Sequence, residues 1–97
     1  MGVFDKAKDL YKMQKEARKI KKKLANIHIE AEADGVVITI NGEQTVIKTE
    51  IKDKSLLSDQ PKLETALTTA FNKAIKKSQE IAAEEMKDIM GNLGLSG

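Results

Sequence analysis

The stretch IHIEAEADGVVITING, residues 27–42, decides the fold class. Apolar and polar residues alternate from position 27 to 34, which is the period of a half-buried strand. Asp34-Gly35 then suits a two-residue hairpin turn. Residues 36–40 are mostly β-branched, as strands favour, and Asn41-Gly42 predicts a second hairpin turn. The stretch therefore predicts two antiparallel strands and the start of a third.

Residues 44–52 predict that third strand and complete a three-stranded antiparallel meander within positions 27–52. Every second residue is expected on one face of it, namely Thr45, Ile47, Thr49 and Ile51. A connector over 53–60 follows, with a single helical turn expected at Ser55-Leu56-Leu57. Ser58 or Asp59 can cap the next helix, and Pro61 suits its first turn.

A long helix is predicted over residues 61–90. Gly91 is expected to end it, and 91–97 are expected to form a flexible tail. Its apolar residues recur at helical spacing, with Ile81 adjacent to the stripe: Leu63, Leu67, Ala70, Phe71, Ala74, Ile75, Ala82, Met86, Ile89 and Met90. This pattern predicts a helix with one face packed on the sheet.

A first helix is predicted over residues 4–26, where apolar residues recur in steps of three and four. The apolar stripe consists of Val3, Ala7, Leu10, Met13, Ala17, Ile20, Leu24 and Ile27. A second stripe on another face is entirely basic, with the same steps: Lys8, Lys12, Lys15, Lys19 and Lys22. The helix is thus amphipathic, and its lysines form a continuous ridge.

Composition narrows the class of protein. The 97 residues predict one domain, 1–97, and 40% hydrophobic with 33% charged residues suits a soluble globular chain. The absence of cysteine excludes disulfides, thiolate metal sites and cysteine nucleophiles. No apolar run is long enough for a membrane span, and no secretory signal is visible.

Charge is distributed unevenly. Residues 1–25 hold nine basic and three acidic groups, a net charge of +6, whereas the remainder holds eight and twelve, a net charge of −4. This asymmetry favours a polyanionic partner for the first helix. The alternative is an ordinary solvated helix face, because lysine is a good helix former. A second basic group on the long helix consists of Lys73, Lys76 and Lys77. It either contributes to contact with such a partner or is an ordinary solvated face.

Helix lengths predict a homodimer. At 1.5 Å per residue the two helices extend about 35 and 45 Å, whereas a seven-residue strand spans about 23 Å. Both apolar stripes therefore overshoot the sheet, and a second copy is the economical way to cover them. The alternative is a monomer in which the two helices pair with each other.

Catalytic and metal-binding signals are weak, so we expect neither an enzyme nor a cofactor nor a small-molecule substrate. His28 is the single histidine, mid-strand among glutamates. The row Glu30, Glu32 and Asp34 could hold a hard cation, but such a row is more often the wet side of a sheet. Gly35 and Gly42 are isolated turn glycines and form no phosphate loop.

The basic ridge is the strongest functional signal. Lysine and arginine contact DNA phosphates without reading sequence, and a step of three or four residues places one cation about every 5 Å along the helix. Arg18 is the only arginine, so we expect weak sequence selectivity for duplex DNA. The alternatives are an adaptor whose helical arms clasp another protein, and binding to a membrane surface, which the lack of tryptophan disfavours.

Several segments resemble the YbaB/EbfC family of small bacterial nucleoid-associated proteins. The resemblance begins at residues 11–15 (YKMQK) and continues through residues 36–42 (VVITING). It is most specific from Ile51 onward, in Asp53, Leu56-Leu57, Leu67, Ala70-Phe71-Asn72 and Ala74.

The resemblance implies an α+β fold of order α-β-β-β-α, in a tweezers-like homodimer with projecting helices. It implies cytoplasmic binding of double-stranded DNA with little sequence preference, nucleoid organisation and modulation of gene expression. The family offers no catalytic residues to transfer. Its DNA contacts are attributed to the projecting helices, which corresponds here to Lys8, Lys12, Lys15, Arg18, Lys19, Lys22 and Lys23.

Overall fold

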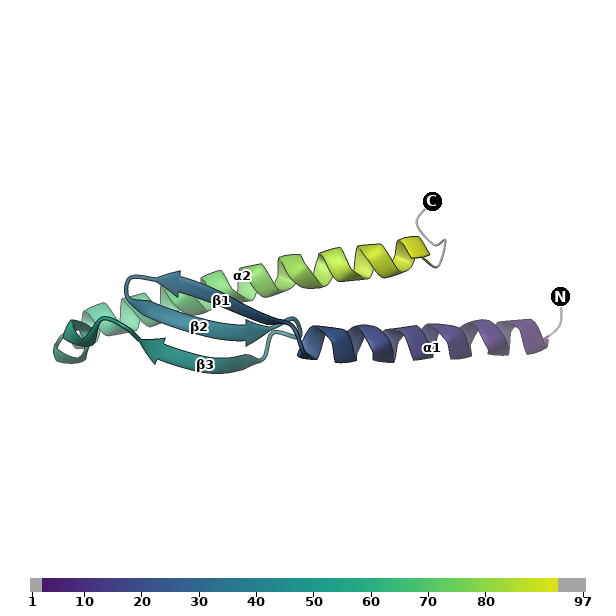
Figure 1. Ribbon diagram of the computed structural model, residues 1–97, viewed down its shortest axis with the longest axis horizontal. Coiled ribbons are helices and arrows are strands. Elements are labelled where there is room, and N and C mark those ends of the chain that lie inside the picture. Colours follow the sequence, from purple (N-terminus) through teal and green to yellow (C-terminus); the bar gives the residue numbers. More distant parts are fainter. Residues whose placement is uncertain (1–2, 93–97) are drawn as a thin grey trace.

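The computed structural model describes residues 3–92, except the side chains of residues 3–7, 89, 90 and 92 (Figure 1). The predicted α-β-β-β-α order is confirmed, and the strands form one antiparallel sheet in the order β1-β2-β3. The molecule is elongated, with extents of 68 × 22 × 17 Å. Its elements are α1 (Val3–Ala25), β1 (His28–Ala33), β2 (Val36–Asn41), β3 (Val46–Ile51), the short 3-10 helix η1 (Lys54–Ser58) and α2 (Gln60–Asn92).

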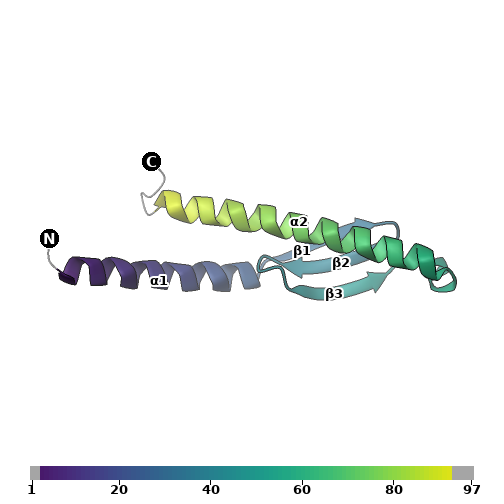
Figure 2. The ribbon, with the colours of Figure 1, turned by 180° about the vertical axis from the view of Figure 1, so that it is seen from behind.

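Helix α2 lies across β1 and β2 and leaves much of β3 uncovered (Figure 2). Small residues at every fourth position, Ala66, Ala70 and Ala74, are fully buried against the sheet. They allow the helix backbone to approach the sheet closely. From β1 and β2, the core receives Ala31, Val36, Ile38 and Ile40.

The buried face of α2 is shifted from the predicted stripe. Ala66 and Ser78 are buried although neither belonged to that stripe, whereas Ile75 is 37% exposed and Met86 49% exposed. The larger apolar residues lie on a flank because the centre of a close helix–sheet contact has room only for small side chains. The Ser78 hydroxyl donates to the Asn41 carbonyl, 2.7 Å away, and this bond satisfies its buried oxygen.

The first hairpin turn is as predicted and the second is not. Asp34 and Gly35 have φ of 51° and 88°, the left-handed geometry of a two-residue hairpin turn. Asn41, however, ends β2, and residues 42–45 form a longer loop in which Gln44 takes the positive φ. The Asn41 side chain stabilises this loop by accepting hydrogen bonds from the Glu43 and Thr45 amides at 2.9 and 3.0 Å.

Gly42 is needed for packing against α1. Its amide donates to the Leu24 carbonyl at 2.8 Å, and an added Cβ would lie 2.9 Å from that same oxygen. The Asn41 amide side chain also donates to the Ala25 carbonyl at 3.4 Å. The loop therefore anchors the C-terminal end of α1 to the sheet.

Strand β3 is shorter than predicted and carries a bulge. It begins at Val46, and the register with β2 shifts so that Ile40 pairs with Val46 while Thr39 pairs with Lys48. Two residues, Val46 and Ile47, therefore stand opposite Ile40. The regular alternation of faces expected for residues 44–52 is broken here.

Helix ends follow the capping rules, with one exception. The Asp59 carboxylate accepts from the Lys62 amide at 3.2 Å, so Asp59 caps α2, with Pro61 in the first turn. The expected turn at 55–57 is η1, capped by Asp53, whose pKa is lowered by hydrogen bonds from Ser55. The prediction that Gly91 ends the helix is wrong, because α2 continues to Asn92. One glycine costs a helix only about 1 kcal/mol and does not by itself stop it. Residues 93–97 of the predicted tail lie outside the described residues.

Both helices project beyond the sheet, as their lengths predicted, and both do so in the same direction (Figure 1). Near the sheet, Leu24 of α1 is buried, with only 8% of its surface exposed. Further out, Leu10 and Met13 are 61% and 55% exposed. At Leu10 and Met13, therefore, the apolar face of α1 is not covered within one copy. Within residues 3–92, no helix has the length and apolar character needed to cross a membrane.

Neighbouring leucines in η1 provide a test of the core. Leu56 is 4% exposed and packs in the core, whereas Leu57 is 64% exposed. Leu56→Ala should lower the free energy of unfolding by about 2–5 kcal/mol, because it leaves a cavity. Leu57→Ala should change it by less than about 0.5 kcal/mol. Chemical denaturation followed by circular dichroism measures both, and equal losses would contradict this packing.

Candidate nucleic-acid interface

The predicted DNA-contacting residues all lie exposed on the projecting helix α1. Because they recur in steps of three and four, Lys8, Lys12, Lys15, Lys19 and Lys22 form one face, which we call the basic face. The face opposite contains the apolar residues of α1. Arg18 and Lys23 lie on either flank of the basic face. The ridge predicted from spacing thus exists as a continuous solvent-facing surface.

Two members of the set are engaged in ion pairs. Lys19 lies 3.6 Å from Glu16 within α1, and Lys23 lies 2.6 Å from Glu85 of α2. Among the side chains that the structure describes, no acid lies within ion-pair distance of Lys12, Lys15 or Lys22. Most of the charge on the basic face is therefore available to an external anion.

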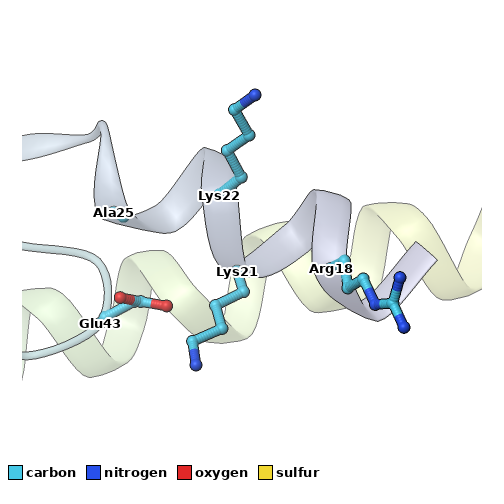
Figure 3. Close-up of a pocket in the computed structure, with 5 residues that line it drawn as sticks. All are labelled: Arg18, Lys21, Lys22, Ala25 and Glu43. Atoms are coloured by element: carbon cyan, nitrogen blue, oxygen red, sulfur yellow. The ribbon is translucent and has the colours of Figure 1, made fainter. Parts of the chain in front are cut away.

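A shallow hollow of about 280 Å³ opens beside the base of α1 (Figure 3). It is lined by Arg18, Lys21, Lys22, Ala25 and Glu43, so three cations face one carboxylate. Lys21 and Lys22 extend to opposite sides of α1 in Figure 3. A hollow with this excess of positive charge favours an anionic group such as a phosphate.

A second hollow of about 190 Å³ adjoins the first and shares Arg18 with it. Its other lining residues are Tyr11, Gln14 and Lys15. Together the hollows follow the Arg18 flank of α1. Lys21 did not belong to the predicted set, because it falls off the lysine stripe. Its place three residues after Arg18 is the signal that could have found it.

Two lysines of α2 form hydrogen bonds to the backbone of β1. The ammonium groups of Lys73 and Lys77 donate to the backbone carbonyls of Glu32 and Glu30, at 2.8 and 3.1 Å. They cover the outer edge of β1, where unpaired carbonyls would otherwise attract another strand. Of the second basic group, only Lys76 is left without such a hydrogen bond among the described contacts.

The acidic row is solvent-exposed, with Glu30 and Glu32 on β1 and Asp34 in the turn that follows it. No group of three potential ligands in the described part of the chain is arranged to hold a metal ion. On β3, Glu50 lies between Lys52 and Lys48, at 2.7 and 3.2 Å, and their hydrogen bonds and charges lower its pKa. This side of the sheet therefore carries acidic side chains along β1 and charges of alternating sign along β3.

Comparison with known proteins identifies the family. The model of the YbaB/EbfC DNA-binding family matches residues 1–93. The chain belongs to this family. The family binds DNA and is not a family of enzymes.

Relatives and a solved structure agree with this assignment. The chain is 35% identical to a nucleoid-associated protein of Prochlorococcus marinus strain MIT 9312, over 97% of this chain and 80% of that one. It is 32% identical to a nucleoid-associated protein of Pelotomaculum thermopropionicum, over 93% and 89% of the two chains. The crystal structure of the uncharacterized protein HP0035 from Helicobacter pylori has the same fold, with a TM-score of 0.75 at 22% identity. That likeness covers 96% of this chain and 97% of that one.

An apolar surface runs along the side of the molecule that α2 leaves open. On β3, Val46 and Ile47 are 42% and 47% exposed. Because Lys73 and Lys77 reach over β1, the opposite flank of α2, with Phe71 and Ile75, faces the β3 side. We call these four residues, together with the half-buried Leu67 and Ile51, the β3–α2 surface.

Proposed function

We propose that this protein is a homodimer that binds double-stranded DNA with little sequence preference through the basic face of α1. In this role it organises the bacterial nucleoid and modulates gene expression. The observation that carries the proposal is the uninterrupted basic face on a helix that projects away from the sheet. Membership of a DNA-binding family and the names of the relatives support it.

The chemistry of the basic face accounts for low selectivity. Lysine ammonium groups contact phosphates as point charges and carry no information about the bases. Base edges are read by arginine, asparagine and glutamine in fixed geometries. Along α1 only Arg18 and Gln14 are of these types between Lys8 and Lys23. Binding is therefore dominated by the release of counterions from the DNA.

The β3–α2 surface supports dimerisation. An isolated copy would expose several large apolar side chains there, at the side of a sheet whose edge strand β3 is open. The other edge, on β1, is covered by Lys73 and Lys77. A second copy placed on the β3 side would cover the apolar residues of both. Two such copies carry two basic helices, which suits a long polyanion.

The proposed function predicts a linear salt dependence that is shared by unrelated sequences. Two 30-base-pair duplexes of different sequence, titrated by fluorescence anisotropy across a salt series, should bind with equal affinity. The logarithm of the affinity should fall against the logarithm of salt with a slope of roughly −4 to −8, which corresponds to about five to nine phosphate contacts. A strong preference for one duplex would contradict the proposal, because it requires base readout.

A second candidate is a protein-interaction adaptor, favoured by the exposed Leu10 and Met13 on α1 and Met86 on α2. These side chains could hold the apolar face of another protein's helix between the arms. The adaptor predicts a protein partner that stays bound after nuclease treatment. If neither duplex binds even at low salt, the DNA-binding proposal fails and the adaptor takes its place.

A further inference from the structure

A single ion pair joins the two projecting helices within the described part of the chain. The Lys23 ammonium of α1 lies 2.6 Å from the Glu85 carboxylate of α2. Glu85 belongs to an acidic segment of α2 that also includes Glu80, Glu84 and Asp88. The basic helix α1 thus lies beside an acidic segment of α2, and the two are joined at this ion pair.

Glu85 depends on Lys23. The Oε2 atom of Glu85 is shielded from solvent, and no described donor other than Lys23 lies near it. The Glu85 side chain is 20% exposed, against 58% for Lys23. When a carboxylate is largely removed from water, loss of its only cationic partner costs free energy, because the charge is then left without compensation. The hydrogen bond and charge of Glu85 also raise the pKa of Lys23, so this ammonium group stays charged at neutral pH.

A DNA phosphate competes with Glu85 for the same ammonium group. Lys12, Lys15 and Lys22 can turn to a phosphate without breaking an ion pair among the described side chains. Lys23 must first leave Glu85, and the nearby charge of Asp88 adds to its attraction toward α2. Binding energy gained at the phosphate is therefore offset by the loss at Glu85.

We infer that Glu85 occupies the position at Lys23 that a phosphate would otherwise take, so that Lys23 does not contribute to DNA binding. The DNA is thereby confined to the Arg18 flank of α1. The inference rests on the proposed function. Glu85 is then a positioning residue that determines the affinity for DNA and the face of α1 that the DNA approaches. The hollows along the Arg18 flank, away from Lys23, then receive the sugar–phosphate backbone.

The test is a set of charge-neutralising variants measured by anisotropy with one duplex across a salt series. Glu85→Gln should bind about two- to fivefold more tightly, and its salt slope should steepen by about 0.9 for each protomer that contacts the duplex, because each gains one phosphate contact. Glu84→Gln is the matched control, since it removes the same charge from the neighbouring exposed position. It should give a smaller gain with an unchanged slope.

Lys23 itself distinguishes this role from a purely structural one. Lys23→Gln should leave the affinity and the slope of the wild-type protein nearly unchanged, and should abolish the gain in the Glu85→Gln background. Lys22→Gln should weaken binding equally in both backgrounds. Thermal melts by circular dichroism establish that each variant is folded.

A readout without DNA tests the ion pair alone. Acetylation by limiting acetic anhydride, followed by mass spectrometry, should modify Lys23 more slowly than Lys22 in the wild type and equally fast in Glu85→Gln. The inference is overturned if Lys23→Gln weakens the wild type as much as Lys22→Gln, or if Glu84→Gln matches Glu85→Gln. A wild-type protein that binds no duplex overturns instead the proposed function.

Discussion

Reversing four charges on the basic face, by changing Lys12, Lys15, Lys19 and Lys22 to Glu, should abolish DNA binding. Each change removes one phosphate contact and places a repelling charge beside the DNA. We expect a loss of at least about a hundredfold near 0.1 M salt, and a salt slope that is shallower by about 3.6 for each protomer that contacts the duplex. Fluorescence anisotropy with the two unrelated duplexes measures both quantities.

The effect of the protein's net charge must be distinguished from the effect of where the charges lie. The four substitutions lower the formal charge from +2 to −6. Changing the exposed lysines Lys54, Lys62, Lys76 and Lys87 to Glu produces the same net charge without altering α1. This control should bind far more tightly than the first variant. If affinity survives the changes on α1, the assignment of the basic face is wrong.

Placing two charges on the β3–α2 surface should convert the protein to a monomer. Ile47 and Ile75 are 47% and 37% exposed in one copy, so glutamate is tolerable at both positions in an isolated protomer. In a dimer the same two side chains would be buried as unpaired charges, which is strongly unfavourable. The double variant should sediment at 10.7 kDa, whereas the wild type should sediment at twice that mass, 21.4 kDa.

Loss of the dimer should also weaken DNA binding, because two linked binding surfaces gain about 10²- to 10⁴-fold over one. We expect the double variant to bind a long duplex about a hundredfold more weakly. Thr65→Glu with Thr69→Glu is the control, since it adds the same charges to exposed positions elsewhere on α2. A wild type that is monomeric at micromolar concentration would refute this interface.

The direction of the basic face depends on a small junction at the base of α1. Gly42 and Asn41 bind the last carbonyls of α1, and Ser78 of α2 binds the Asn41 carbonyl. Two helices are therefore joined by hydrogen bonds to one short segment at the end of β2. Because the outer part of α1 has little other support within one copy, this junction determines where its lysines point.

Local sequence patterns were sufficient to predict the order of the helices and strands and the basic face of α1. Three patterns in the sequence each depend on residues that are close together along the chain: the period-two alternation, the Asp34-Gly35 turn and the lysine spacing on α1. Their local geometry can therefore be predicted from the sequence alone. The order α-β-β-β-α and the overshooting helices followed from these patterns. The family resemblance extended them to DNA binding, which the family match supports.

Features that depend on contacts between distant segments required the tertiary structure. The sequence by itself determined that Asn41-Gly42 interrupts two strands, but only packing against Leu24 decided that Gly42 anchors a helix. The same holds for Ala66 and Ser78, which lie outside the predicted stripe and are buried because α2 approaches the sheet closely along that side. It also holds for Lys23, whose charge is evident from sequence but whose partner, Glu85, lies 62 positions further along the chain. Charge and periodicity are local properties, whereas close approach and pairing exist only once the chain has folded.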